Sequence, residues 1–358
     1  WKEKSIYASS LKVVDQVRAV DPQTVEVTVS QATAPFVPQT LGNPLMPMLA
    51  KEVYEPDGKF SNKIVGTGWM IFDRWEKGTS LSYKANPDYW QKGTDGKSLP
   101  YIDGWVTRVI GSEPAMAAAF RAGQLDLLGG QGGVLKDNFD ALKRDIPDLK
   151  SEDGERANIR FLEFNYGVKP LDNLAVRQAM CSALSQADII KLAVDNDAKQ
   201  TGLIPVSIKD FAWPEEKVKH MYAPNVARAR QLLSAAGVGN LSFELSNYGA
   251  GAEYVRGAQY LQQALAAIGV TTNLKLMAST GDAIAYEQSG NWQLMLAGGR
   301  TTFEVDDWIT GPFHSKSARN FSKYANSEFD RLAEAEVTAL DPAQRKRIVD
   351  QIQDHFVN

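Results

Sequence analysis

A strand–helix–strand succession in the second half of the chain constrains the fold more than any other feature. Residues 241–245 alternate apolar and polar side chains, as a half-buried strand does, and a second strand is predicted at 272–277. The helix predicted between them, 253–268, carries one apolar stripe, formed by Val255, Ala258, Leu261, Leu265 and Ile268. This spacing predicts a βαβ unit with a parallel strand pair and a right-handed crossover. We therefore expect α/β structure in this half of the chain.

Shorter strands are predicted nearer the N-terminus. Residues 24–29 alternate strictly, and Ser80–Lys84 and Val106–Ile110 have the composition of strands. Residues 125–128 form a short apolar run that also predicts a strand. The predicted elements change to mixed α/β structure after the charged stretch 150–156. We therefore expect a domain boundary there.

The composition excludes some classes of function. At 358 residues the chain has room for about two or three domains, and 44% apolar residues are enough to bury sizeable cores. The formal net charge of −4 is mixed along the chain with no basic arm, so we expect no nucleic-acid partner. No apolar run reaches the ~18 residues of a membrane-spanning helix.

The sequence carries no recognisable catalytic, metal-binding or nucleotide-binding motif. Its one cysteine, Cys181, shares a predicted helix with Val176, Ala179 and Met180, so we expect a buried and unreactive side chain. The three histidines lie in unrelated contexts, and no His-Glu-x-x-His, Cys-x-x-Cys, Gly-x-Ser-x-Gly or dinucleotide-binding fingerprint is present. We expect no cofactor, no metal site and no catalytic residue.

Polar residues follow two predicted strands, and ligands of open α/β sheets bind beyond the ends of strands. After residues 125–128 comes a glycine-rich loop in which Gly130 and Gln131 could bring backbone N–H groups to an anion or a sugar hydroxyl. The alternative for this loop is a flexible turn. Glu163 and Asn165 end the next predicted strand, and Glu163 is a candidate for ligand contact there. Asn165 is a candidate for ligand contact, or alternatively makes a structural hydrogen bond that orders the chain there.

Several blocks along the chain resemble one known family. The central block is the strand Phe161-Leu162-Glu163-Phe164-Asn165-Tyr166, followed by a Pro/Asp turn and a helix that starts near Val176. The other blocks, in chain order, are 11–29, 66–90, 122–126, 222–237 and 320–330. Together they resemble the family 5 extracellular solute-binding proteins, the peptide, nickel, opine and oligosaccharide receptors of ABC importers.

The resemblance implies a two-lobed fold like that of periplasmic binding proteins, type II, in its three-domain variant. Residues 1–45 would be the tail of the small second domain, 46–156 a part of the first lobe, and 157–358 the second lobe. The C-terminal return segment would be missing, and we expect the chain, which begins at Trp1, to be cut at both ends. Residues 158–165 would form a crossover about which the lobes close on a solute.

The resemblance also implies a function without chemistry. Such a receptor captures a small solute outside the cytoplasmic membrane, in the periplasm or at the extracellular membrane surface, and delivers it to ABC permease subunits. We expect a monomer. Two alternatives stay open: a hydrolase that acts on a sugar or a peptide in a similar cleft, and a scaffold or chaperone-like protein of the same fold, which would bind no small molecule.

The segment 297–308 is similar to the cleft loop of the family, Gly-Trp-x-x-Asp-Tyr-x-Asp-Pro. The Asp that holds a peptide amine in the peptide receptors falls here on Thr302 or Phe303, whereas Arg300 offers a planar fork for a carboxylate, a phosphate or vicinal hydroxyls. An ion pair of Arg300 with a nearby acid is the alternative. The residues of this loop expected at the ligand are Arg300, Thr302, Phe303, Glu304, Asp306 and Trp308. The loop favours an oligosaccharide, an opine or another carboxylated metabolite, and peptide binding stays open.

Overall fold

The computed structural model describes residues 11–42, 50, 53, 64–129, 134, 136–152, 154, 158–249, 251–298 and 304–357. The described residues divide into two compact units. Unit 1 takes those within Trp1–Gly42 and Glu152–Asn358, and unit 2 those within Asn43–Ser151. The three-domain division with boundaries at 45/46 and 156/157 stays a prediction.

Unit 2 contains an antiparallel sheet with the strand order β3-β4-β5, followed by two helices. The elements are β3 (Met70–Glu76), β4 (Ser80–Ala85), β5 (Gly104–Arg108), α2 (Glu113–Arg121) and α3 (Lys136–Asp145). The side chain of Ser112 caps α2 by accepting a hydrogen bond from the backbone N–H of Ala115. The prediction of a strand at 125–128 was wrong, because these residues form a bend and irregular chain.

Unit 1 begins with an antiparallel hairpin of β1 (Val14–Asp21) and β2 (Thr24–Val29), followed by the short helix η2 (Phe36–Leu41). The alternating pattern predicted β2 correctly, although Val25, its second residue, is exposed. The backbone N–H of Ala34 donates to the carbonyl of Val337, at 2.8 Å, which ties this segment to the C-terminal part of the unit.

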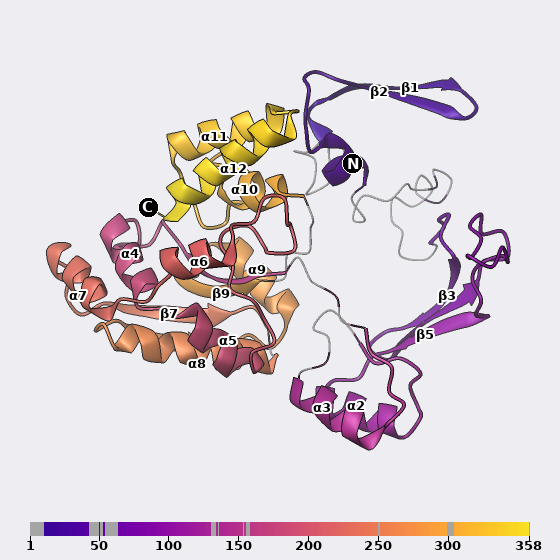
Figure 1. The fold of residues 1–358 in the computed structure, drawn as a ribbon, viewed down its shortest axis with the longest axis horizontal. Coiled ribbons are helices and arrows are strands. Elements are labelled where there is room, and N and C mark those ends of the chain that lie inside the picture. The colour runs from indigo at the N-terminus through magenta and orange to yellow at the C-terminus, as the bar shows by residue number, and fades with distance from the viewer. Residues whose placement is uncertain are drawn as a thin grey trace. The chain divides into compact units, whose positions relative to one another are not determined.

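The main sheet of unit 1 has the strand order β6-β9-β7-β8, and its strands β7 and β9 are labelled in Figure 1. Strands β7, β8 and β9 are parallel, while β6 runs antiparallel to β9 at one edge. The strands are β6 (Arg160–Phe164), β7 (Ser242–Asn247), β8 (Thr271–Lys275) and β9 (Leu294–Gly298). With helix α8 (Ala252–Ala266) between β7 and β8, the predicted βαβ unit and its parallel pair are confirmed.

Strand β9 is buried on both faces, as the continuous apolar run of a central strand requires. Leu294 and Leu296 pack into a core that includes the stripe of α8, and Met295 and Ala297 pack on the opposite face beside Trp292. The remaining helices of this part are α4 (Leu174–Ser182), α5 (Gln186–Val194), α6 (Glu215–Met221), α7 (Val226–Ala235) and α9 (Thr280–Ser289). The strand after which the predicted ligand loop begins is therefore held firmly in place.

Three C-terminal helices share a second core, and α11 and α12 lie side by side (Figure 1). They are α10 (Asp306–Phe313), α11 (Ser327–Thr338) and α12 (Pro342–Val357). The fully buried side chains Trp308 and Phe329 lie in this core.

The prediction that Cys181 is buried was wrong, because this residue is exposed on α4. Val176, Ala179 and Met180 do form the buried face of that helix. Successive residues of a helix are separated by about 100°, so the position after Met180 turns away from the core.

Candidate functional site

The carboxyl ends of β7, β8 and β9 meet at one end of the main sheet of unit 1, together with the amino end of the antiparallel strand β6. The register pairs Arg160 of β6 with Gly298 of β9, and Asn247 of β7 with Leu296 of β9. Loops that leave parallel strands at this end are where open α/β sheets bind their ligands. We call it the carboxyl edge and take it as the candidate site.

Asn247 fixes the backbone at the carboxyl edge. Its side-chain amide donates to the carbonyl of Gly249 at 2.7 Å, and its side-chain oxygen accepts from the N–H of Met277 at 2.7 Å. The asparagine is fully buried, so these bonds form away from water. The loops that leave β7 and β8 are thereby joined to each other.

Gly298 lies where three groups crowd the end of β9. A Cβ atom at this position would lie 3.0 Å from the Tyr254 hydroxyl, 3.1 Å from Cγ of Arg160 and 3.1 Å from the carbonyl oxygen of Ile159. A larger residue would fit only if these groups moved by a few tenths of an ångström, so glycine suits this close approach. Arg160 and Tyr254 therefore lie directly beside the last described residue of β9.

Half of the residues predicted at the ligand lie outside the described part of the chain. Gly130 and Gln131 belong to the segment 130–133, and Arg300, Thr302 and Phe303 to the segment 299–303. Glu304, the first described residue after the second of these segments, is buried.

Glu304 and Asp306 enter a buried cluster of charges. Arg345 of α12 forms an ion pair with Glu304, and its Nε donates to Oε1 of Glu336 at 2.6 Å. The backbone N–H of Asp306 donates to Oε1 of Glu304 at 3.3 Å. We call Glu304, Asp306, Glu336 and Arg345 the charge cluster. It anchors the chain immediately after residues 299–303 to α11 and α12.

The charge cluster contains three carboxyl groups and one guanidinium, so full ionisation would leave an excess of buried negative charge. Burial raises the pKa of Asp306 to about 6, and the charges of Glu304 and Asp307 act in the same direction. Burial and the charge of Asp306 raise the pKa of Glu336 to about 8, although Arg345 opposes this. Among the described residues, Oδ1 of Asp306 and Oε2 of Glu336 have no hydrogen-bond partner. The raised pKa and the unpartnered oxygen both favour a bound proton on Asp306 and on Glu336.

Trp308 lies in α10, whereas the sequence placed it in a loop. Its side chain is 2% exposed and packs among apolar side chains of α11 and α12. Contact between Trp308 and a solute would thus require this packing to change.

Glu163 and Asn165 lie at the opposite end of the sheet from the carboxyl edge, because β6 runs antiparallel to β9. Asn165 is fully buried, and its amide donates to the carbonyls of Gly290 and Trp292 at 3.1 and 2.7 Å. Its side-chain oxygen accepts from the N–H of Gly167 at 3.0 Å. These contacts match the structural alternative considered for Asn165. The structure does not bring Glu163 and Asn165 together with Glu304 and Asp306.

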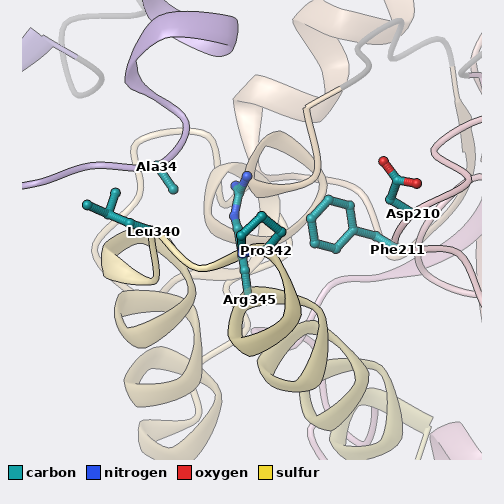
Figure 2. Close-up of a pocket in the computed structure, with 6 residues that line it drawn as sticks. All are labelled: Ala34, Asp210, Phe211, Leu340, Pro342 and Arg345. Carbon is teal, nitrogen blue, oxygen red and sulfur yellow. The ribbon is translucent and has the colours of Figure 1, made fainter.

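A separate pocket of about 380 Å³ opens beside the charge cluster. In Figure 2 the side chain of Arg345 lies between Ala34 and Leu340 on one side of the pocket and Phe211 and Asp210 on the other. The lining residues are Ala34, Asp210, Phe211, Leu340, Pro342 and Arg345. The guanidinium carbon of Arg345 lies 5.4 Å from the centre of the Phe211 ring. The two acids paired with Arg345 are buried, whereas the carboxylate of Asp210 at the other side of the pocket belongs to an exposed residue.

The described residues contain neither a metal-binding cluster nor a membrane-spanning helix. No group of three or more histidine, cysteine or acidic side chains is arranged to hold a metal ion. Within the same part of the chain, every helix is too short or too polar to cross a membrane.

Arg160 and Arg345 are the residues that sequence reasoning missed. Arg345 looks like one of several charged residues in α12, and its acid partners lie in distant segments. Arg160 could have been found, because it starts the strand of the central family-like block. Its place beside Gly298 depends on long-range pairing that a sequence does not display.

Comparison with known proteins assigns the chain to a family. The family described as bacterial extracellular solute-binding proteins, family 5, middle region, matches residues 2–321. The chain is 25% identical over 363 aligned residues to the glutathione-binding protein GsiB of Escherichia coli O1:K1, covering 96% of this chain and 66% of that protein. It therefore spans slightly less than two thirds of this curated relative.

Solved structures confirm the predicted fold class. The periplasmic binding protein DppA from Helicobacter pylori, in complex with the peptide STSA, matches with a TM-score of 0.84 and 22% identity, over 98% of this chain and 68% of that one. The binding protein AgaA from A. tumefaciens, in complex with agropinic acid, matches with a TM-score of 0.79 and 20% identity, over 99% and 71%. These neighbours have the two-lobed fold of family 5 binding proteins. The chain belongs to the bacterial extracellular solute-binding proteins, family 5.

Proposed function

We propose that this chain is the solute-binding component of an ABC importer. The observation that carries the proposal is the family match over residues 2–321. Family 5 proteins deliver solutes to ABC permeases, so the partners would be a small molecule and the permease subunits. The protein would act in the periplasm or at the extracellular membrane surface, as a monomer. No observation favours the hydrolase alternative, and the family and its neighbours are binding proteins rather than enzymes.

We place the solute at the carboxyl edge of unit 1. Two fixed points support this placement: Gly298 at the end of β9 and Glu304 in the charge cluster. The chain between them contains Arg300, Thr302 and Phe303, which remain proposed contacts, as do Gly130 and Gln131. Among the described site candidates, Glu304, Asp306 and Trp308 would support the loop from within the core. Glu163 and Asn165 would order the far end of the sheet.

The solute class that we favour is an oligosaccharide, an opine or another carboxylated metabolite, and an acidic peptide is the next candidate. The sequence between Gly298 and Glu304 contains an arginine and no acid, which suits an acidic or hydroxylated group better than a peptide amine. The relatives have varied ligands, as printed for glutathione, the peptide STSA and agropinic acid.

A thermal-shift screen with glutathione, short peptides, opines and oligosaccharides tests the proposal. A ligand that binds only the folded state stabilises it by an amount that rises with the logarithm of the ratio of its concentration to its Kd. We expect one class to raise the midpoint of unfolding, with no product formed on prolonged incubation. Turnover of a bound compound would overturn the assignment as a binding protein.

Closure of the two lobes around the solute is part of the same proposal. Small-angle X-ray scattering with a saturating amount of a ligand from the screen should show a smaller radius of gyration. An unchanged radius at saturation would contradict closure.

A further inference from the structure

We propose that Arg160 selects solutes that carry a carboxylate or a similar planar anion. This inference rests on the proposed function, since it names the chemical group that the carboxyl edge recognises. The sequence pointed to Arg300 for this role, whereas Arg160 emerges from the pairing of β6 with β9.

The position of Arg160 is the first argument. It is the first residue of β6 and lies opposite Gly298, the residue after which the proposed solute loop begins. Its Cγ lies 3.1 Å from where a Cβ of residue 298 would be, so the absence of that atom lets the arginine reach the end of β9. A side chain placed here lies where ligands of parallel sheets bind.

The orientation of the guanidinium is the second argument. Its central carbon lies 4.8 Å from the centre of the Tyr254 ring, and Nη2 lies 3.1 Å from Oε1 of Glu253. Stacking on an aromatic face and one ion pair fix the plane of the group before any solute arrives, which reduces the entropy lost on binding. Arg160 is thus held in place for recognition.

The number of donors is the third argument. A guanidinium carries five N–H donors, of which one on Nη2 of Arg160 goes to Glu253 and a further one to the side-chain oxygen of Tyr254. The Arg160 side chain is 33% exposed, whereas that of Glu253 is 16% exposed, so the cation is the more accessible member of the pair. A carboxylate from solution could accept from the remaining N–H groups as a second, bidentate partner.

A purely structural role is the competing explanation. In that case the ion pair with Glu253 and the stacking on Tyr254 only join β6 to the first turn of α8. Substitution of Arg160 would then lower stability without discriminating between acidic and neutral solutes. The two explanations therefore differ in ligand preference.

The test uses the full chain, isothermal titration calorimetry and three pairs of acidic and neutral compounds. The pairs are glutathione and its diethyl ester, tri-alanine and tri-alanine amide, and agropinic acid and its ethyl ester. The variants are Arg160→Gln and Arg160→Lys. Arg256→Gln is the matched control. Arg256 lies in α8, and like Arg160 it is a partly exposed arginine that forms an ion pair with an acid, here Asp195.

We expect the wild type to bind at least one acid about tenfold or more tightly than its neutral partner, the lower end of a charged hydrogen bond. Arg160→Gln should remove that preference by weakening the acid alone. Arg160→Lys should keep a part of it, because lysine retains the charge without the fork. Arg256→Gln should leave both affinities within twofold.

Three outcomes would overturn the inference. If an acid binds and Arg160→Gln retains its affinity within twofold, Arg160 does not recognise it, and the proposed function stands. If the wild type binds acid and neutral partner equally, the site does not select anions, and the proposed function again stands. If none of the six compounds binds, the inference fails, and binding of an oligosaccharide in the thermal-shift screen would still support the proposed function. Should Arg160→Gln not fold, the wild-type preference and Arg160→Lys decide the matter.

Discussion

Replacing Arg345 by methionine tests the argument that the charge cluster holds the chain next to the proposed solute loop. Arg345 is bound to Glu304 and Glu336, whose side chains are 10% and 0% exposed, and methionine fills a similar apolar volume without charge. Removing one partner of a buried ion pair costs about 3–5 kcal/mol, because the remaining charges stay buried without compensation. We expect Arg345→Met to lower the free energy of unfolding by about that amount at pH 8.

The cost should depend on pH. Without the guanidinium, the carboxyl groups of the cluster bind protons more tightly in the folded state, so the variant regains stability as the pH falls. Each unit of pKa difference corresponds to about 1.4 kcal/mol, and we expect the cost to shrink by about 1–3 kcal/mol between pH 8 and pH 5.

Urea unfolding followed by circular dichroism, at pH 5, 6.5 and 8, measures both quantities. Arg347→Met is the matched control, because Arg347 lies on the exposed side of α12, and its replacement should change stability by at most about 0.5 kcal/mol. A cost for Arg345→Met that is below 1 kcal/mol, or that is the same at all three values of pH, would refute the reasoning about the cluster.

Three further predictions follow from single residues. Asn165→Ala should lower the free energy of unfolding by about 2–4 kcal/mol, since it removes one buried and two part-buried hydrogen bonds, while solute affinity stays constant. An affinity loss without destabilisation would restore its ligand role. The pKa of folded Glu336, about 8, lies above its ordinary value of 4.5, so its proton stabilises the fold fully below about pH 4.5 and this contribution is lost as the pH rises through 8. Glu336→Gln should therefore show a flatter stability profile from pH 5 to 9 than the wild type, and parallel profiles would contradict this. Asn326→Ala should cost about 1 kcal/mol in chemical denaturation by removing the cap that accepts from the N–H of Phe329, and no change would show that the cap is dispensable.

Local patterns predicted the βαβ unit because each of its parts is encoded in adjacent residues. The apolar stripe of α8 and the alternation in β7 require no knowledge of distant segments. The start of α10 was not predicted, because the adjacent residues carry no local signal for a helix. Val305 provides no side-chain cap, and Gly311 and Pro312 within the helix favour a loop in the sequence, so only burial of Trp308 and Ile309 explains why this segment is helical.

The candidate site was harder to predict because its parts come from segments far apart in the chain. The glycine before residues 299–303 was visible in the sequence, but Arg160 becomes its neighbour only through the antiparallel pairing of β6. The same pairing sends Asn165 to the far end of the sheet, which no local pattern could reveal. Glu304 and Arg345 are 41 positions apart, and charge alone gave each of them several plausible partners.

The burial of β9 on both faces has a consequence for how a binding protein with this fold could acquire a new ligand. A strand packed between two cores tolerates few substitutions, and so does Glu304, because its ion pair with Arg345 is buried. Changes at positions 299–303, by contrast, leave both anchors intact. We therefore expect randomisation of positions 299–303, the proposed solute contacts, to change ligand preference at little cost in folding stability.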